Sequence, residues 1–351
     1  MPTGRPWPTA PDPMRAISMT ATGGPEVLTP ADLPDPQPGP GELLVDVAAV
    51  GVNYIDTYHR RGVYPVDLPF VPGLEGTGRV LALGSGDTLG FTVGDRVAWE
   101  DAHGSYARRV AVPAALAVPV PDAVPDDVAA GALLQGMTAH FLVTDCAPVG
   151  PGDTVLVHAA AGGVGLLLTQ LATARGARVV GVVSTAEKEE LARDAGAAEV
   201  LRPSSTSGGD LAAAVRELTG GAGVPVVFDG VGRDTVDASL ASLRRRGTLV
   251  VFGAASGPVP PVDPQRLNAA GSVYLTRPKL GDYVATRAEL THRAAAVYAA
   301  VADGSLHVRI GHRYPLDRAA DAHVELESRR TTGKVLLLPD DPAAHAGHLL
   351  S

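Results

Sequence analysis

The stretch TVLVHAAAGGVG, residues 154–165, decides the fold of the middle of this chain. Its first residues are apolar and β-branched, which predicts a buried strand over 154–160. A glycine-rich turn follows, and the apolar residues after it predict a helix over 163–175. Together these elements form a phosphate cradle, because backbone N–H groups and the positive end of the helix converge on an anion.

The glycines of this turn predict a dinucleotide-binding site. In the pattern G-x-G-x-x-G the second and third glycines are Gly162 and Gly165, whereas the first position holds Ala160. Gly163 and Val164 complete the turn at which we expect the cofactor to bind. Glycine-rich turns often serve close packing alone, so the pattern of the surrounding sequence decides the interpretation.

The alternation of strands and helices continues on both sides of the turn. Further strands are predicted over 178–184, 199–202, 224–230, 247–253 and 272–277, and further helices over 185–195, 208–219 and 234–243. Apolar strands that alternate with amphipathic helices predict a parallel sheet covered on both faces. Residues 138–277 are therefore expected to form a doubly wound α/β cofactor domain.

The flanking sequence has a different pattern, with short alternating strands between Pro/Gly turns. Strands are predicted over 43–50, 77–84, 95–100 and 105–112, and later a helix over 286–303 and a returning strand over 334–339. Such spacing favours an antiparallel, partly barrelled, mostly-β domain. We expect 14–137 and 278–351 to form this catalytic domain, and the Pro-rich residues 1–13 to be a disordered N-terminal extension.

Length and charge narrow the function classes. The 351 residues suffice for two domains, and the net charge of −9 argues against a nucleic-acid or anionic-membrane surface. No apolar run approaches the roughly 18 residues of a membrane span. The single cysteine, Cys146, excludes an internal disulfide and favours a reducing, cytoplasmic location.

The residues after the second strand of the cofactor domain indicate which dinucleotide binds. An NAD site usually has Asp or Glu there for the adenosine ribose, whereas this strand ends at Ser184 with Lys188 four residues on. A hydroxyl and a cation suit a 2′-phosphate, which favours NADPH. The alternative for Lys188 is a solvated helix residue that pairs with Glu187.

Several motifs, in consistent order over nearly the full length, resemble the zinc-free quinone oxidoreductases of the medium-chain dehydrogenase/reductase superfamily, the zeta-crystallin relatives. They are GVNYIDTYHRRGVYP (51–65), PGLEGTGRV (72–80), GDRV (94–97), HAAAGGVG (158–165), DGVGRDT (229–235), LTRPKL (275–280) and LESRRTTGKVLLLP (326–339). The resemblance implies a GroES-like catalytic domain and a Rossmann domain that binds NADPH. It also implies a homodimer formed through the last strand of the sheet.

The resemblance carries residue roles to this chain. It implies that Asn53, Tyr54 and Tyr58 line the nicotinamide and substrate pocket as catalytic residues, with Asn53 and Tyr58 also contacting the cofactor. The remaining implied cofactor residues are Gln135, Thr138, Gly162, Gly163, Val164, Gly165, Ser184, Lys188, Phe252, Gly253, Ala254, Ala255, Leu275, Thr276, Arg277, Gly333 and Lys334. Alternatively, Asn53 caps a turn, and Gln135 and Thr138 pack within a helix.

We expect no metal. Zinc alcohol dehydrogenases that resemble this chain have a cysteine ligand where Asn53 stands and a histidine where Leu74 stands. Thiolate and imidazole are the ligands that zinc prefers, and the carboxylates of Asp56 and Glu75 alone make a poor zinc site. Without a Lewis acid the chemistry shifts from alcohol oxidation towards the reduction of conjugated electrophiles.

Other residues depart from the family or are interpreted structurally. A tyrosine that stacks by the adenine in bacterial relatives is matched by Pro203, and polar residues after the fifth strand are matched by Ala254 and Ala255. His158 is expected to be a hydrogen-bonded core histidine. His59 and Arg60 are expected to be solvated.

Three functions stay open at this stage. The first is an NADPH-dependent quinone reductase that is free of zinc and flavin. The second is an NADPH-dependent reductase of enone or enoyl double bonds, acting on a conjugated carbonyl. The third is a non-enzymatic NADPH-binding protein, crystallin-like or RNA-binding, which the acidic charge and the retained cofactor glycines disfavour.

Overall fold

The structure, a computed structural model, describes residues 13–203 and 208–339. The disordered extension expected over 1–13 lies outside these residues, apart from Pro13. The chain divides into two compact units, and each is described by itself. Among the described residues, one unit contains those up to Ala130, His312–Arg329 and those from Val335, and the other contains those between Gly131 and Gly311 and Arg330–Lys334.

The second unit is built on a parallel sheet of six strands within the described residues, in the order β10-β9-β8-β11-β12-β13. The strands are β8 (Thr154–His158), β9 (Arg178–Val182), β10 (Glu199–Leu201), β11 (Val224–Asp229), β12 (Leu243–Val251) and β13 (Tyr274–Thr276). The helices between them are α3 (Gly163–Ala174), α4 (Ala186–Asp194), α5 (Gly208–Leu218), α6 (Val236–Ser242) and α7 (Pro264–Ala269).

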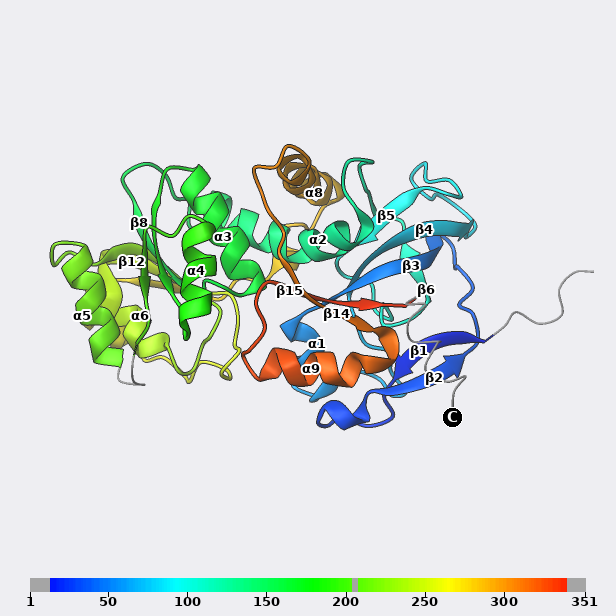
Figure 1. Ribbon diagram of the computed structural model, residues 1–351, viewed down its shortest axis with the longest axis horizontal. Coiled ribbons are helices and arrows are strands. Elements are labelled where there is room, and N and C mark those ends of the chain that lie inside the picture. The colour runs from blue at the N-terminus through cyan, green and yellow to red at the C-terminus, as the bar shows by residue number, and fades with distance from the viewer. Residues whose placement is uncertain (1–12, 204–207, 340–351) are drawn as a thin grey trace, which may run out of the picture. The chain divides into compact units, whose positions relative to one another are not determined.

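The strand order explains how the sheet is covered. The chain moves outward from β8 to β10 and then crosses back to β11 and β12, so right-handed crossovers place the two sets of helices on opposite faces. Helices α3 and α4 lie on one face and α5 and α6 on the other (Figure 1). The predicted doubly wound Rossmann fold is confirmed.

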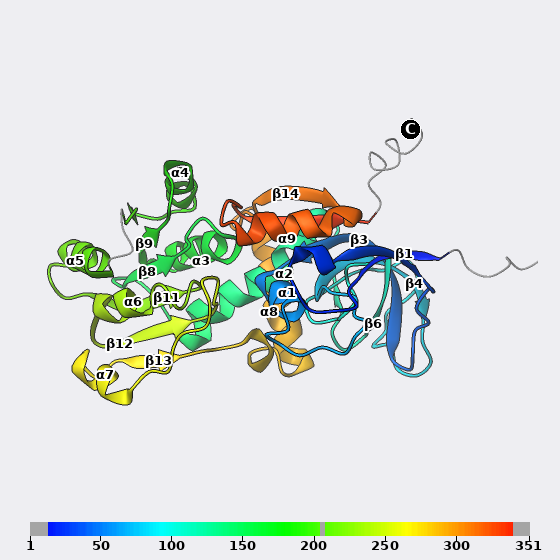
Figure 2. The ribbon, with the colours of Figure 1, turned by 90° about the horizontal axis from the view of Figure 1, so that it is seen from below.

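The first unit is mostly β and antiparallel, as predicted. Its larger sheet has the order β14-β15-β3-β4-β5-β7, with β6 also paired to β3. These strands are β3 (Glu42–Val52), β4 (Glu75–Leu83), β5 (Arg96–Trp99), β6 (Arg109–Pro113), β7 (Val118–Pro119), β14 (Ile310–Pro315) and β15 (Lys334–Leu338), and β1 (Met14–Ser18) pairs with β2 (Thr29–Leu33). Strand β15 lies antiparallel to β3, which confirms the predicted return of the C-terminal strand (Figure 1). Figure 2 shows β3, β4 and β6 side by side in this unit.

Two helices of the first unit escaped sequence prediction. Helix α1 (Tyr54–Arg60) is only seven residues long, and α9 (Ala319–Glu327) is nine. So few residues give too little periodicity to separate a helix from a loop. Both carry residues of the candidate site.

Residues 278–311 belong to the second unit, although the sequence pattern places them in the catalytic domain. Helix α8 (Arg287–Ala302) packs against α2 (Asp126–Phe141), where a Cβ on Gly136 would lie 2.7 Å from a methyl of Val297. In addition, the Phe141 ring stacks on Tyr283 with centroids 4.2 Å apart. These apolar contacts join the segment to the second unit.

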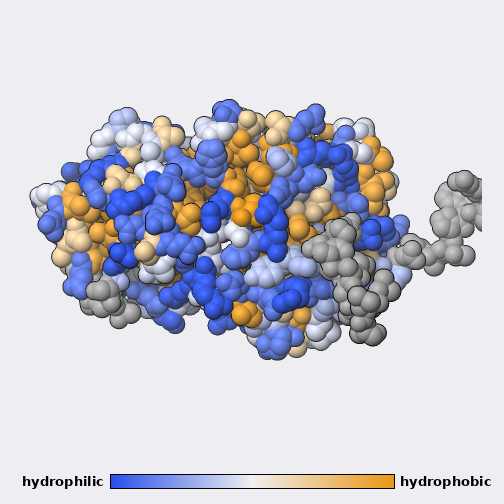
Figure 3. All heavy atoms as spheres, viewed as in Figure 1, coloured by the Kyte–Doolittle hydropathy of each residue, from blue (hydrophilic) through white to orange (hydrophobic). Residues whose placement is uncertain are grey.

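No helix in the described parts of the chain is long and apolar enough to cross a membrane. On the face drawn in Figure 3, hydrophilic residues are interspersed with hydrophobic ones.

Candidate active site

The glycine-rich turn of the second unit is shaped for a close approach to its backbone. Strand β8 ends at His158, Ala159 takes a φ of 50°, and Gly162 caps the N-terminus of α3. A Cβ on Gly165 would lie 2.2 Å from the carbonyl oxygen of Ala159, so only glycine fits between strand and helix. The turn thereby presents the first N–H groups of α3, which suit a pyrophosphate.

Gln135, one of the predicted cofactor residues, lies against Gly163 of this turn. A Cβ on Gly163 would lie 2.1 Å from Oε1 of Gln135, which comes from α2. Thr138, one turn later, donates its hydroxyl proton to the carbonyl of Leu134 at 2.7 Å. The helix-packing alternative therefore describes Thr138, whereas the amide of Gln135 lies against the cofactor turn.

The C-terminal turn also reaches the glycine-rich turn. The N–H of Gly333 donates to the carbonyl of Ala161 at 3.1 Å. Gly333 has a φ of 66°, and a Cβ there would meet the carbonyl of Arg309 at 2.3 Å. Lys334, next along the chain, is buried with 1% of its surface exposed. Residues far apart in sequence thus converge on one loop.

The residues predicted to bind adenosine lie after β9, at the carboxyl end of the parallel sheet. Ser184 is exposed, and the Thr185 hydroxyl accepts from the N–H of Lys188 at 3.2 Å, which caps α4. Lys188 therefore stands in the first turn of α4, close in sequence to the end of β9.

The remaining predicted cofactor residues follow β12 and β13 at the same edge of the sheet. Phe252, Gly253, Ala254 and Ala255 come directly after β12 and are partly buried. A Cβ on Gly253 would lie 2.5 Å from the carbonyl of Gly230, so two loops pack backbone to backbone there. Leu275 and Thr276 close β13, and Arg277 donates to the carbonyl of Pro278.

In the first unit, Asn53 is fixed at the end of β3. The side chain is 4% exposed, and its Nδ2 donates to Oε2 of Glu75 at 2.8 Å and to the Gly51 carbonyl at 3.2 Å. Its backbone N–H donates to Oδ2 of Asp56 at 2.8 Å. Asn53 therefore begins α1, as the turn-capping alternative expects, while its amide is held by a buried carboxylate.

Three tyrosines surround the start of α1. The rings of Tyr54 and Tyr58 have centroids 6.5 Å apart, and those of Tyr58 and Tyr64 are 5.6 Å apart, edge to face. The Tyr54 hydroxyl donates to the carbonyl of Leu326 at 3.0 Å, and burial raises its pKa. The Tyr54 hydroxyl is therefore used in a hydrogen bond within the protein, whereas the aromatic side chain of Tyr58 is partly exposed.

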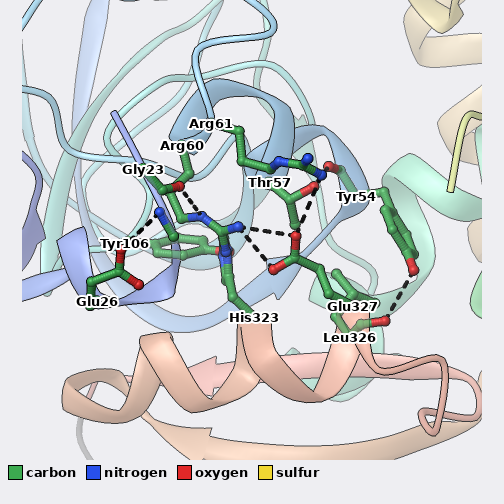
Figure 4. Close-up of polar contacts among 11 residues, drawn as sticks. Gly23, Glu26, Tyr54, Thr57, Arg60, Arg61, Tyr106, His323, Leu326 and Glu327 are labelled. Carbon is green, nitrogen blue, oxygen red and sulfur yellow. Dashed lines mark hydrogen bonds and ion pairs between the residues drawn. The ribbon is translucent and has the colours of Figure 1, made fainter. Parts of the chain in front are cut away.

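A buried polar network holds α1 to α9 (Figure 4). Arg60 donates two hydrogen bonds to the carboxylate of Glu327, at 3.0 and 2.9 Å, and one to Nδ1 of His323 at 3.0 Å. Nε2 of His323 lies 2.9 Å from the Tyr106 hydroxyl, which donates to Asp56 at 2.9 Å. The network thus runs from α9 to the carboxylate that caps α1.

The donors of this network fix the state of His323. Arginine only donates, so Nδ1 must accept, and the Tyr106 hydroxyl, which donates to Asp56, must accept from Nε2–H. His323 is therefore the neutral Nε2–H tautomer. Burial, followed by the charge of Arg60, lowers its pKa to about 3, which agrees with the hydrogen bonds.

The expectation that His59 and Arg60 are solvated is wrong. Arg60 is 1% exposed and His59 is 8% exposed. Burial, together with His103, lowers the pKa of His59 to about 4. Charged and imidazole side chains on a short helix look solvated in sequence, but α1 is covered on both sides by the chain.

His158 is a core histidine, as expected. It is 1% exposed, and its Nε2 lies 3.0 Å from the Ser239 hydroxyl, which donates to Asp229. Asp229 also accepts from the N–H groups of Val231 and Gly232. These residues order the turn after β11.

Comparison with known proteins identifies the family. The alcohol dehydrogenase GroES-like domain model matches residues 39–122, and the zinc-binding dehydrogenase model matches residues 163–296. A quinone oxidoreductase of Pseudomonas aeruginosa is 43% identical over 327 residues, which cover 93% of this chain and 99% of that protein. The chain belongs to the quinone oxidoreductase family.

One further relative has a different name, and one similar solved structure contains NADPH. A 2-haloacrylate reductase of Burkholderia sp is 41% identical over 325 residues, which cover 90% of this chain and 96% of that protein. The solved structure of a mycobacterial protein complexed with NADPH is 57% identical, covers 93% of this chain and 100% of that chain, and has a TM-score of 0.89. The predicted membership of the medium-chain dehydrogenase/reductase superfamily is confirmed.

The carboxylates beside Asn53 accept hydrogen bonds from neighbouring side chains, and this role suits them better than binding a metal ion. The Glu75 carboxylate accepts from Asn53, and Asp56 accepts from Asn53 and Tyr106. Within the described residues, no three His, Cys, Asp or Glu side chains are grouped to hold a metal ion. The metal-free site remains a prediction.

Sequence reasoning missed the residues that support the site. Asp56 and Glu75 entered it only as poor metal ligands, while Tyr106, His323 and Glu327 were not singled out. The role of Asp56 could have been predicted, because NYID places its carboxylate three residues after Asn53, which is the spacing of a capping box. The partners in α9 carry no such local signal.

Proposed function

We propose that this chain is an NADPH-dependent quinone reductase that works without zinc or flavin. The observation that carries the proposal is the turn at Gly165, where a Cβ would collide with the backbone and the first N–H groups of α3 are exposed to an anion. The family supports the reaction, and the mycobacterial complex supports the cofactor. The first unit would then be the catalytic domain and the second the cofactor domain.

The residues of the second unit fit the parts of NADPH, which supplies a hydride when bound. Gly162, Gly163, Val164 and Gly165 would bind the pyrophosphate through backbone N–H groups. Ser184 and Lys188 would bind the 2′-phosphate, Lys188 as a point charge. The residues that would hold the nicotinamide and its ribose are Gln135, Thr138, Phe252, Gly253, Ala254, Ala255, Leu275, Thr276, Arg277, Gly333 and Lys334.

The residues of the first unit would serve the acceptor. Reduction of a quinone spreads the new negative charge over the acceptor itself, so the protein needs mainly to orient a flat molecule and offer a hydrogen bond. Tyr58 would pack against the acceptor or donate its hydroxyl proton as a hydrogen bond. Asn53, held by Glu75, would keep the start of α1 in place for both ligands.

The reaction is tested by following NADPH oxidation with 1,4-benzoquinone, 9,10-phenanthrenequinone and a trans-2-enal, with and without a chelator. Turnover of the quinones that is indifferent to the chelator would support the proposal. Turnover of the enal alone would favour the double-bond reductase, which the similarity to a 2-haloacrylate reductase supports weakly. NADPH binding without turnover of any acceptor would favour a non-enzymatic role.

Cofactor preference is tested with Lys188→Ala. Loss of a charged hydrogen bond to the 2′-phosphate should reduce the preference for NADPH over NADH by about 10- to 150-fold, since such a bond contributes roughly 1.5–3 kcal/mol. The dissociation constants are measured by fluorescence titration. Lys279→Ala is the matched control, because Lys279 is 74% exposed and pairs locally with Asp282. An equal effect of both variants would contradict the assignment.

The homodimer and the cytoplasmic location belong to the same proposal. Strand β13 is the last strand of the sheet order, and its Tyr274 is 63% exposed. An open strand edge with an exposed aromatic residue favours pairing with a second copy. The free thiol of Cys146 is in keeping with a reducing compartment.

A further inference from the structure

Two loops of the second unit lie backbone to backbone at the carboxyl end of the parallel sheet. The first loop, 229–235, begins at the last residue of β11, and the second loop, 252–257, follows β12 directly. Four hydrogen bonds of 2.9–3.2 Å from N–H to carbonyl join them, from Phe252 to Asp229, Ala255 to Gly230, Ser256 to Val231 and Arg233 to Gly257. The shape of the first loop therefore affects the second.

The side chain of Ser256 fastens the second loop to the first. Ser256 is 8% exposed, and it is not among the residues proposed to bind NADPH. Its hydroxyl donates to the carbonyl of Val231 at 2.8 Å and accepts from the N–H of Asp234 at 3.0 Å. One hydroxyl thus satisfies two backbone groups of the first loop.

The first loop is in turn ordered by the carboxylate of Asp229, which is 0% exposed. Its Oδ1 accepts from the N–H groups of Val231 at 2.8 Å and Gly232 at 3.0 Å. Its Oδ2 accepts from the hydroxyls of Thr235 at 2.7 Å and Ser239 at 2.8 Å. A carboxylate buried in this way needs its donors, because each unmade hydrogen bond leaves a desolvated polar group.

The same carboxylate is connected to the glycine-rich turn. The Ser239 hydroxyl donates to Asp229, so it accepts from Nε2–H of His158 at 3.0 Å. Burial lowers the pKa of His158, although Asp229 acts in the opposite direction, and the neutral ring agrees with these bonds. His158 is the last residue of β8, and Ala159 begins the turn that would bind the pyrophosphate.

We propose that Asp229 and Ser256 are positioning residues, which hold residues 252–255 in a fixed place relative to the glycine-rich turn. This role for NADPH rests on the proposed function, in which 252–255 bind the nicotinamide end. Hydride transfer requires the reacting atoms to lie about 3–3.5 Å apart, so a displaced loop would misplace the nicotinamide. The adenosine end, bound after β9, would not be affected.

The first experiment compares two ligands by calorimetric titration: NADPH and adenosine 2′,5′-bisphosphate, which is its adenosine half. In Ser256→Ala, NADPH should bind about fivefold more weakly, as when about a fifth of the molecules keep the binding conformation. The bisphosphate should bind as in the wild type. Ser242→Ala is the matched control, because Ser242 is 0% exposed and its hydroxyl donates only within α6, to the carbonyl of Ala238 at 2.8 Å.

The outcomes of this titration separate positioning from a general structural effect. Unchanged NADPH affinity in Ser256→Ala, or equal weakening of both ligands, would overturn the proposal. A wild type that binds neither ligand would overturn both this proposal and the proposed function. A wild type that binds NADPH but reduces no quinone contradicts only the reaction, and the titration still decides the positioning.

The second experiment tests the anchor at Asp229 by rescue. Thr235→Val removes the hydroxyl that donates to Asp229, whereas Thr235→Ser keeps it. With NADPH and 1,4-benzoquinone, kcat should fall about fivefold in Thr235→Val and return to within about twofold of the wild type in Thr235→Ser. Equal kcat in the two variants would contradict the anchor. If Thr235→Val does not fold, the titration of Ser256→Ala decides.

Discussion

At the scale of single residues, burial decides what each ionisable group does. Arg60 is expected from the sequence to be solvated, yet it is 1% exposed and donates a hydrogen bond to His323, which is 0% exposed. A neutral His323 is required because Arg60 donates to Nδ1. Protonation of His323 would place two buried cations 3.0 Å apart.

His323 should therefore make the protein sensitive to acid. Its folded pKa of about 3 lies below the unfolded value near 6.5, so its stabilising contribution is complete above pH 6.5 and is lost as the pH falls towards 3. At pH 4.5 we expect a loss on the order of 2–3 kcal/mol in the free energy of unfolding relative to pH 7. Urea unfolding at both pH values measures it.

The variant His323→Gln isolates this contribution. Glutamine keeps an acceptor and a donor but does not titrate, so the difference between pH 7 and pH 4.5 should shrink by about the same amount. His59, whose pKa is about 4, changes in the same direction and is present in both proteins, so it does not affect the comparison. An unchanged pH dependence in His323→Gln would show that His323 is not the acid-sensitive group.

At the scale of elements, two contacts set the positions on which the site depends. The ion pair of Arg60 with Glu327 joins α1 to α9, and its arginine is almost fully buried, with 2% of the side chain exposed. The glycines of the turn let α3 pack against the end of β8.

Removal of one partner from the buried pair should be costly. Glu327→Gln leaves the Arg60 guanidinium buried without its counter-charge, which should lower the free energy of unfolding by on the order of 3 kcal/mol. Arg61→Ala is the matched control, because Arg61 is 58% exposed and lies 3.9 Å from the same carboxylate. We expect less than about 1 kcal/mol there. Denaturant unfolding of both variants measures the difference, and equal losses would contradict it.

The glycine at the start of α3 is tested by Gly165→Ala. The new Cβ would lie 2.2 Å from the Ala159 carbonyl, so α3 must shift, at a cost of about 1–3 kcal/mol in stability and with weaker NADPH binding. Gly150→Ala is the control, since nothing lies within 4 Å of its Cβ and its φ is not positive. Thermal unfolding and NADPH titration read both effects. Wild-type affinity in Gly165→Ala would argue against the turn as the cofactor site.

At the scale of the whole molecule, the open edge of the sheet is the feature that bears on assembly. We expect the wild type to have twice the mass of the chain in light scattering, and Tyr274→Lys to shift it towards the monomer, because a lysine on an edge strand opposes pairing. Val93→Lys is the matched control, as Val93 is also 63% exposed but lies in the other unit. A monomeric wild type, or dissociation of the dimer by both variants, would contradict a dimer formed through β13.

The sequence by itself determined the doubly wound sheet, the glycine-rich turn and the antiparallel domain, because strand alternation, helix periodicity and glycine spacing are local properties. It also predicted that the apolar run over 334–339 returns to the first unit as a strand, whereas the pairing of β15 with β3 comes from the structure. Only the tertiary structure decided which charged residues are buried. Arg60 and Glu327 are 267 residues apart in the chain, and they meet only because the fold brings α1 and α9 together. A charged side chain has the same covalent chemistry on the surface and in the interior, but its protonation and its role depend on whether the fold buries it.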